Sequence, residues 1–308
     1  MIVALTGGTG GAKLVEGLAA AVDPAELTIV CNTGDDCVFH GLHISPDIDT
    51  ITYTLAGLSD TEKGWGIKGD TFTALEQLRR LGNDAWFNLG DKDLATHIMR
   101  TRLLREGRKL SEITEQIRSA LGVSAKILPM SDDWFETRVK TPSGEIPFQE
   151  FFVKKRWAPD VLAVRFVGVE QARPAPGVLD AIRHAEAIII CPSNPITSIG
   201  PILAVPGIRA ALEEAEVPVV GVSPMIGAAA ISGPAHKLML ASGVQASALG
   251  VAKFYKDFLD KLLIAVEDTG IARDIEGLGI STFCTNIRMT SMTDKKRLAR
   301  EVLASVEK

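Results

Sequence analysis

Residues 1–22 read MIVALTGGTGGAKLVEGLAAAV, and this stretch decides the fold class of the chain. The apolar run of residues 1–6 is typical of a buried strand, and residues 12–22 have the pattern of an amphipathic helix. The sequence Gly-Gly-Thr-Gly-Gly joins the two at residues 7–11. A strand, a glycine turn and a helix in this order form an anion site, because glycine lets backbone N–H groups approach an oxyanion and the helix N-terminus favours negative charge.

Lys13 supports the same interpretation of the glycine turn. A cation in the first helical turn is repelled by the helix dipole unless an anion binds nearby. We therefore predict a nucleotide phosphate site made of Gly7, Gly8, Thr9, Gly10, Gly11 and Lys13. The alternative is a tight strand–helix turn that binds no ligand.

The common nucleotide motifs are absent from this turn. A dinucleotide fingerprint needs a third glycine where Lys13 stands, and an acidic residue after the second strand, which ends here in Cys-Asn. A Walker A loop needs Gly-Lys-Ser/Thr, whereas residues 11–14 read Gly-Ala-Lys-Leu. Neither tyrosine has the lysine four residues later that a short-chain reductase needs. NAD chemistry and ordinary ATPase chemistry are therefore disfavoured.

Composition sets limits on partners and location. The 308 residues are 46% hydrophobic and carry a formal net charge of −5, without the basic stripe that nucleic acid requires. The four cysteines show no C-x-x-C spacing, which suits a reducing cytoplasm. The spacing of the histidines and cysteines matches no zinc motif. The first apolar run is cut by glycines after six residues, so we interpret it as a strand rather than a signal peptide. We expect a cytoplasmic protein with no nucleic-acid or membrane partner.

Apolar runs that alternate with helical patterns define the predicted core. The runs are residues 2–5, 27–31, 86–89, 187–191, 217–222 and 262–266, and the helical patterns include 71–81, 94–104, 206–214 and 293–306. Strands that are continuously apolar are covered on both faces. The pattern predicts a Rossmann-like, doubly wound α/β fold with a mostly parallel sheet, which binds ligands at the carboxyl ends of its strands.

The middle of the chain has a different pattern. After a helix at 111–121, strands with polar alternation are predicted at 126–130, 135–141, 146–154 and 161–168, with a hairpin turn at 141–144. No helix of ordinary length separates these strands. We predict a nucleotide-binding core of residues 1–105 and 166–308, with a smaller α+β insertion of residues 106–165 beside the cleft.

Aspartates follow the predicted strands at the edge that carries the glycine turn, namely Asp35, Asp36, Asp47, Asp49, Asp91 and Asp93. Carboxylates beside bound phosphates repel them unless a hard cation lies between, and Mg²⁺ takes oxygens of both kinds. We predict Mg²⁺ as the cofactor, with Asp35, Asp36 and Asp47 as ligands. The alternative for any single aspartate is a helix N-cap, and Asp49 and Asp93 each precede a helical pattern.

A further turn, Cys-Pro-Ser-Asn-Pro at residues 191–195, follows a buried strand. The hydroxyl, the amide and the free N–H groups of such a turn suit phosphate or base recognition. We predict that Ser193, Asn194 and Pro195 contribute to the nucleotide site. The alternative is a rigid proline-rich loop in which Asn and Ser act only as caps.

Several motifs, in this order, resemble the 2-phospho-L-lactate transferase family. They are TGGTGGAK at 6–13, NTGDD at 32–36, GLHISPDIDT at 41–50, GWGIKGDTF at 64–72, NLGDKDLATH at 88–97 and CPSNP at 191–195. The resemblance extends beyond residue 230. It implies an enzyme of coenzyme F-420 biosynthesis, as in archaea and related actinobacterial proteins. That enzyme transfers the 2-phospho-L-lactyl group from lactyl-2-diphospho-5'-guanosine to the ribityl hydroxyl of 7,8-didemethyl-8-hydroxy-5-deazariboflavin (Fo), giving GMP and coenzyme F-420-0.

The resemblance also implies roles for four residues. It suggests that Asp49 and Lys92 contact Fo, and that Asp47 and Asp91 position the metal or the hydroxyl. These four are the candidate catalytic residues, and none of them stands out as an obligatory base. The resemblance further implies a homodimer.

Two questions stay open at this point. A sister family of nucleotide-sugar-binding regulatory proteins is expected to carry SDDGGSSG where residues 33–41 read TGDDCVFHG, so the sequence favours the transferase. The acid carried by the donor is the second question. Phospholactate, phosphoenolpyruvate and phosphoglycerate differ by a few atoms, and no residue of the sequence identifies one of them.

Overall fold

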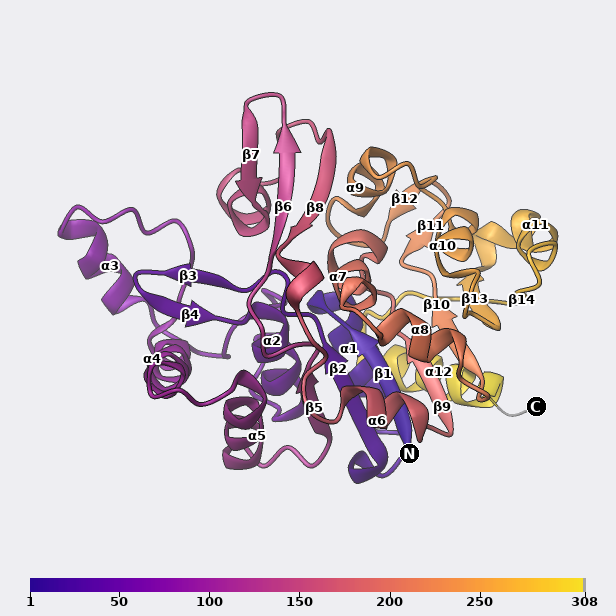
Figure 1. The fold of residues 1–308 in the computed structure, drawn as a ribbon, viewed down its shortest axis with the longest axis horizontal. Helices are drawn as coiled ribbons and strands as arrows, with labels where there is room; N and C mark the ends of the chain where they lie inside the picture. Colours follow the sequence, from indigo (N-terminus) through magenta and orange to yellow (C-terminus); the bar gives the residue numbers. More distant parts are fainter. Residues whose placement is uncertain (307–308) are drawn as a thin grey trace.

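A computed structural model describes residues 1–306 of the chain, and a mostly parallel sheet forms its centre (Figure 1). Within the described residues the sheet has seven strands in the order β14-β13-β10-β9-β1-β2-β5, each parallel to its neighbours. They are β1 (Ile2–Thr6), β2 (Leu27–Cys31), β5 (Lys126–Pro129), β9 (Ala187–Ile190), β10 (Val219–Val222), β13 (Lys261–Ala265) and β14 (Ser281–Thr285). The chain leaves β1 first toward β2 and later returns to β9 on its other side, so the strand order reverses beside β1, where ligands bind in such folds.

Alternation along β1 shows why the fold has two helical layers. Val3 and Leu5 belong to the hydrophobic cluster on one face of the sheet, and Ala4 belongs to the cluster on the other face. Residues of α1, α2 and α12 fill the face of Ala4, and residues of α6 to α11 fill the opposite face. Both faces are therefore covered, which confirms the doubly wound α/β prediction.

The helices flank the sheet and the cleft above it. They are α1 (Gly8–Ala19), α2 (Pro46–Leu55), α3 (Thr73–Arg80), α4 (Asp91–Arg105), α5 (Leu110–Ala120), α6 (Val178–Arg183), α7 (Gly200–Ala204), α8 (Ile208–Glu213), α9 (Ala235–Ala241), α10 (Ala248–Tyr255), α11 (Ala272–Glu276) and α12 (Met292–Val306). No helix of residues 1–306 is both long and apolar enough to cross a membrane.

A small antiparallel sheet projects beyond the carboxyl ends of the central strands, at the top of Figure 1. It has the order β7-β6-β8 and consists of β6 (Glu136–Thr141), β7 (Gly144–Pro147) and β8 (Ala163–Val167). Two short hairpins complete the strands: β3 (Cys37–Phe39) with β4 (Leu42–Ile44), and β11 (Met225–Ile226) with β12 (Ala229–Ala230).

Several predicted elements differ from the structure. The strand predicted at 126–130 in the insertion is β5 of the central sheet, paired with β2. The strand predicted at 146–154 ends at Pro147, and residues 150–154 form a π-helical turn. The run 86–89 is not a strand. Its apolar side chains pack instead with Phe39 of the β3–β4 hairpin, where Leu89 is buried and Trp86 and Phe87 are half-buried without joining a sheet. The edge strand β14 was not predicted, because its residues are mostly half-buried or exposed and not continuously apolar.

Candidate active site

A cavity of about 540 Å³ lies at the carboxyl ends of β1, β2 and β9. The glycine turn lies at one side of it, the first turn of α2 lies beneath, and the segment after β7 supplies aromatic side chains. The cavity is therefore shared by the parallel core and the antiparallel sheet region, and it lies at the carboxyl ends of the strands where the strand order reverses beside β1.

The glycine turn forms the first turn of α1 and not a separate loop before it. Gly7, Gly8, Thr9, Gly10 and Lys13 line the cavity, as predicted. Gly8 has a φ of +68°, a backbone conformation that favours glycine. The turn thus presents backbone and a lysine to the cavity at a helix N-terminus, which is the arrangement expected for an anion site.

Two of the glycines are required by packing. A Cβ on Gly10 would lie 2.7 Å from the carbonyl oxygen of Pro192, and one on Gly11 would collide with the hydroxyls of Thr6 and Ser193. Gly11 does not line the cavity. The absence of side chains here therefore serves the contact between α1 and the loop after β9, whatever ligand binds.

The loop after β9 brings part of the predicted set to the cavity. Ser193 and Asn194 line it, and the Ser193 hydroxyl accepts a hydrogen bond of 3.2 Å from the N–H of Gly7. Pro195 is buried behind the cavity wall. Asn194 also caps the following π-helical turn, where its Oδ1 accepts the N–H of Ile196 at 3.0 Å. Asn194 therefore both lines the cavity and caps the turn that follows it.

Asp35 and Asp47 form an acidic pair on the glycine-turn side of the cavity. Burial raises the pKa of Asp47 to about 6, although its Oδ2 accepts a hydrogen bond of 2.9 Å from Asn32 Nδ2. Burial and the negative charge of Asp47 raise the pKa of Asp35 well above its ordinary value. Within residues 1–306, Asp35 Oδ1 is buried without a hydrogen-bond partner. The pair is therefore short of positive charge.

Asp36, the third predicted metal ligand, does not line the cavity. Its Oδ2 accepts a hydrogen bond of 2.6 Å from Ser45 Oγ and lies 3.0 Å from His43 Nε2. These contacts hold the β3–β4 hairpin against the start of α2. The structure therefore brings Asp35 and Asp47 to the cavity and turns Asp36 away from it.

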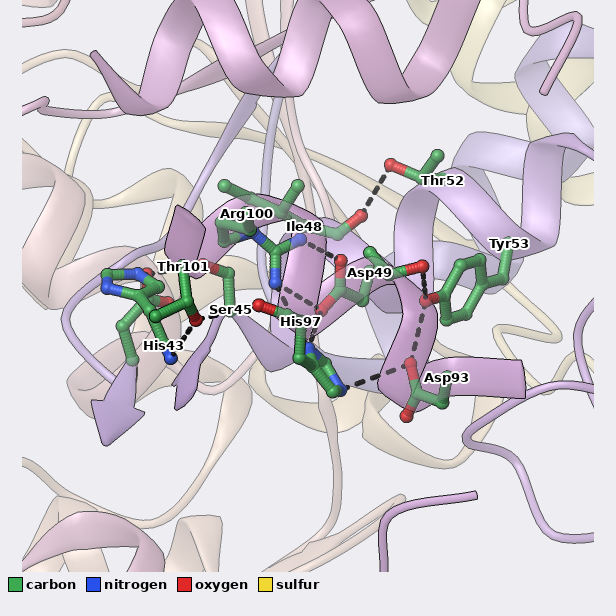
Figure 2. A network of polar contacts seen from close by, with 12 residues as sticks. His43, Ser45, Ile48, Asp49, Thr52, Tyr53, Asp93, His97, Arg100 and Thr101 are labelled. Atoms are coloured by element: carbon green, nitrogen blue, oxygen red, sulfur yellow. Dashed lines mark hydrogen bonds and ion pairs between the residues drawn. The ribbon is translucent and has the colours of Figure 1, made fainter. Parts of the chain in front are cut away.

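Asp49 and Asp93 form a second acidic pair, beside helix α4, and here the protein supplies the positive charge (Figure 2). Both terminal nitrogens of Arg100 bond the carboxylate of Asp49, with Nη1–Oδ2 at 3.0 Å and Nη2 on Oδ1. Tyr53 donates its hydroxyl to Asp93 Oδ1 at 2.7 Å. Burial opposes ionisation of Asp93, yet the neighbouring His97, whose Nε2 lies 3.2 Å from Oδ1, and the hydrogen bond from Tyr53 hold its pKa below the ordinary value.

Asp91 and Lys92 lie outside the cavity. Asp91 accepts the N–H groups of Thr73 and Ala74, both at 3.0 Å, and so caps the N-terminus of α3. Lys92 Nζ lies 3.1 Å from the carbonyl oxygen of Gly69. Their predicted position rested on a strand at 86–89 that the structure does not contain. The geometry gives no support to a catalytic role for Asp91.

Sequence reasoning missed most of the wall that faces the two acidic pairs. Phe148 and Phe152 stack with ring centroids 5.4 Å apart, and Trp157 lies 5.2 Å from Phe152. Further aromatic side chains come from Tyr53, Trp65 and Phe87. Aromatic side chains that line a cavity in this number suit a planar ring system. The only sequence signal was the pair of phenylalanines after the hairpin, in a stretch predicted to be a strand.

One cavity of a doubly wound fold thus brings together a glycine turn, two acidic pairs and several aromatic side chains, an arrangement that suits a small-molecule enzyme. The family model described as 2-phospho-L-lactate transferase CofD matches residues 2–279, and the chain belongs to this family. The protein is therefore an enzyme of the 2-phospho-L-lactate transferase type, related to coenzyme F-420 biosynthesis.

Relatives along nearly the whole chain have two different names. The phosphoenolpyruvate transferase of Streptomyces griseus is 45% identical over 312 residues, which cover 99% of this chain and 98% of that protein. The 2-phospho-L-lactate transferases of Methanococcoides burtonii and Methanothermobacter thermautotrophicus are 43% and 44% identical, each covering at least 98% of both chains. The relatives therefore agree on the family and differ on the acid that is transferred.

A solved structure supports the fold. The crystal structure of a UPF0052 family protein from Bacillus halodurans has a TM-score of 0.64 and covers 98% of each chain. At 19% sequence identity this similarity concerns the fold alone.

Proposed function

We propose that the protein transfers the 2-phospho-L-lactyl group from lactyl-2-diphospho-5'-guanosine to the ribityl hydroxyl of Fo, giving GMP and coenzyme F-420-0. The hydroxyl oxygen attacks the phosphorus that carries the acid, the bond from that phosphorus to the oxygen of GMP breaks, and the hydroxyl proton is released. The observation that carries the proposal is that one cavity has both halves such a reaction needs, a glycine turn for phosphates and an aromatic wall for a ring.

The donor half consists of the cavity-lining residues of the glycine turn with Lys13, Ser193 and Asn194. Backbone N–H groups at the start of α1 suit the diphosphate, and Lys13 adds a positive charge. Because positioning and charge neutralisation supply most of the catalysis in phosphoryl transfer, no single base is needed.

Magnesium is part of the proposal, and the donor side fits it. Asp35 and Asp47 are buried oxygen donors that lack a cationic partner of their own, and Asp35 Oδ1 has no hydrogen-bond partner among the described residues. These two aspartates would hold the ion. When bound, Mg²⁺ supplies charge neutralisation between the carboxylates and the diphosphate oxygens.

The acceptor half consists of the aromatic wall and Asp49. The wall suits the deazaflavin ring, and the carboxylate suits hydroxyl donors of the ribityl chain. We keep Lys92 as a second Fo residue on the family resemblance. That role requires the ammonium group to leave the carbonyl oxygens of Lys68 and Gly69.

The experiment is to incubate the protein with Fo, Mg²⁺ and a guanylyl diphosphate donor that carries phospholactate, phosphoenolpyruvate or phosphoglycerate, and to identify each product by mass. The proposal predicts the highest kcat/KM with the phospholactate donor. The phosphoenolpyruvate donor is the second candidate, because several of the relatives are phosphoenolpyruvate transferases.

The same experiment separates the enzyme from a nucleotide-sugar-binding regulatory protein. A regulator would bind a UDP-sugar and form no product from any donor, which would contradict the proposal. We also propose a homodimer on the family resemblance, and sedimentation equilibrium tests it.

A further inference from the structure

Arg100 is a large buried side chain of the acceptor side that does not line the cavity. It is 0% exposed, and its guanidinium lies behind the Asp49 carboxylate, with a terminal nitrogen on each oxygen. Asp49 itself lines the cavity. Each carboxylate oxygen has a second lone pair, so Asp49 can accept hydrogen bonds from the cavity while the arginine fixes its plane from behind.

Arg100 also determines the tautomer of His97. Its Nη1 lies 3.3 Å from His97 Nδ1, and because a guanidinium only donates, Nδ1 must be the acceptor (Figure 2). The ring proton is then on Nε2, which lies 3.2 Å from Asp93 Oδ1 and makes no aligned hydrogen bond within the described residues. One buried arginine therefore orients two groups that line the cavity.

Asp93 is left with one oxygen for a ligand. Its Oδ1 takes the Tyr53 hydroxyl at 2.7 Å and faces His97 Nε2. Among the described residues no hydrogen-bond donor contacts Oδ2. Asp93 and Asp49 are thus held by different donors, and both offer an acceptor to the same cavity.

Stability does not explain this arrangement. A buried ion pair is on average worth little more than apolar residues of similar volume, because desolvation offsets the attraction. Arg100 Nε is in addition buried without a hydrogen-bond partner within residues 1–306, which is a further cost.

The ligand atoms of Asp49, Asp93 and His97 lie within 4.8 Å of one another, a spacing that suits a metal ion. The guanidinium contacts two of these three groups, however, and already supplies a cation.

We propose that Arg100 is a positioning residue that fixes Asp49 and His97, so that Asp49 and Asp93 present two rigid acceptors to neighbouring hydroxyls of a polyol chain. This inference rests on the proposed function and adds to it by naming the part of the acceptor that is recognised here, the ribityl chain. Carboxylates accept from O–H groups, whereas the aromatic wall on the insertion side suits the ring.

The kinetic test uses Arg100→Lys and Arg100→Gln, with Arg102→Gln as the matched control on the same helix. The Arg102 side chain is 63% exposed, and among residues 1–306 it pairs only with Glu106. In both Arg100 variants we expect the KM for Fo to rise at least roughly tenfold, equivalent to about 1.4 kcal/mol, with unchanged GDP affinity. Lysine keeps the positive charge but cannot bond both carboxylate oxygens as arginine does. The KM for Fo should therefore rise less in Arg100→Lys than in Arg100→Gln. Wild-type KM for Fo in both folded variants would overturn the proposal.

A second measurement needs no substrate and reads the wild-type protein, with a variant used only to assign the signal. Nitrogen NMR of the wild-type protein with labelled histidine reports the tautomer of each ring, and His97→Gln assigns the signal among the five histidines. The proposal predicts a neutral His97 ring with its proton on Nε2. An Nδ1–H tautomer or an imidazolium at neutral pH would overturn it. If the wild-type protein does not turn over Fo, the proposed acceptor is wrong, and the NMR result still decides the role of Arg100.

Discussion

Asp47 and Asp49 lie in the first turn of α2, two residues apart, and meet opposite electrostatic surroundings. Asp49 contacts a buried guanidinium, whereas Asp47 accepts a hydrogen bond from the neutral amide of Asn32. Asp35 adds a second negative charge on the side of Asp47. The protein thus pairs Asp49 with a buried arginine and gives Asp35 and Asp47 no cationic partner among the described residues. This difference is the basis of our proposal that a cation binds on the glycine-turn side and a hydroxyl-bearing ligand on the side of α4.

The largest effect is expected from removal of the cation. In excess chelator, turnover should fall roughly 1,000-fold, because a bound metal stabilises the transferring phosphoryl group by several kcal/mol. Added Mg²⁺ should restore turnover, and Zn²⁺ alone should not. The measurement is steady-state turnover after chelation and again after Mg²⁺ is added back. Full activity in excess chelator would show that the Asp35–Asp47 pair needs no cation, which would contradict the difference proposed between the two acidic pairs.

The Asp35–Asp47 pair also predicts a pH dependence of the free energy of unfolding in metal-free protein. Asp47 has a pKa of about 6 when folded, against 3.8 as the ordinary value, so its stabilising contribution is complete below pH 3.8 and is lost as the pH rises through 6. The free energy of unfolding falls in total by roughly 3 kcal/mol through this titration, and about half of that fall occurs above pH 5.

Thermal or urea unfolding in chelator measures this loss. Between about pH 5 and pH 8, metal-free wild-type protein should lose stability relative to Asp47→Asn, which cannot ionise at this position. Asp160→Asn, at a side chain that is 85% exposed, is the control and should follow the wild type. Parallel curves for wild type and Asp47→Asn would mean that Asp47 carries no unbalanced charge.

A smaller effect separates Asp49 from Lys92. Asp49→Asn should weaken Fo binding by at least roughly tenfold, or about 1.4 kcal/mol, because the carboxylate is replaced by an amide with one acceptor oxygen. Lys92→Ala should weaken it less, because its ammonium group must first leave loop carbonyl oxygens. Fluorescence titration with Fo gives both affinities, and a larger loss in Lys92→Ala would show that residues 68–92 rearrange in the complex.

The smallest effect concerns Asp91. As the cap of α3 it should contribute about 1 kcal/mol, so Asp91→Ala should lower the melting temperature by roughly 2 °C and leave GDP affinity unchanged. Calorimetric melting and GDP titration check the two parts. A folded Asp91→Ala variant with a large loss of turnover at saturating substrates would restore the catalytic role that the sequence suggested.

The sequence was sufficient where the determinant is local. The order of strand, glycine turn and helix at residues 1–22 predicted both the sheet edge and the position of Asp35 and Asp47, because parallel strands bring their carboxyl ends to one edge. The run at 86–89 was misassigned because apolar residues indicate burial and not partners. Its Trp86 ring packs edge-on against Phe39, 5.2 Å away, from a hairpin that the sequence did not indicate.

The α4 side of the site depends on contacts that are distant in sequence. Asp49 and Arg100 are 51 positions apart, and only the packing of α2 beside α4 joins them. One signal was available. Asp93, His97 and Arg100 recur at helical spacing, which places three polar side chains on one face of a predicted helix, the face that the structure shows to be buried.

The central claim is that the two acidic pairs serve different ligands, and one paired titration tests it most directly. GDP with Mg²⁺, and separately Fo, are titrated by calorimetry into Asp47→Asn and Asp49→Asn. The account predicts that Asp47→Asn weakens GDP binding in Mg²⁺ and keeps Fo affinity, whereas Asp49→Asn keeps GDP affinity and weakens Fo binding. Loss of the same ligand in both variants would contradict the division of the site into two halves.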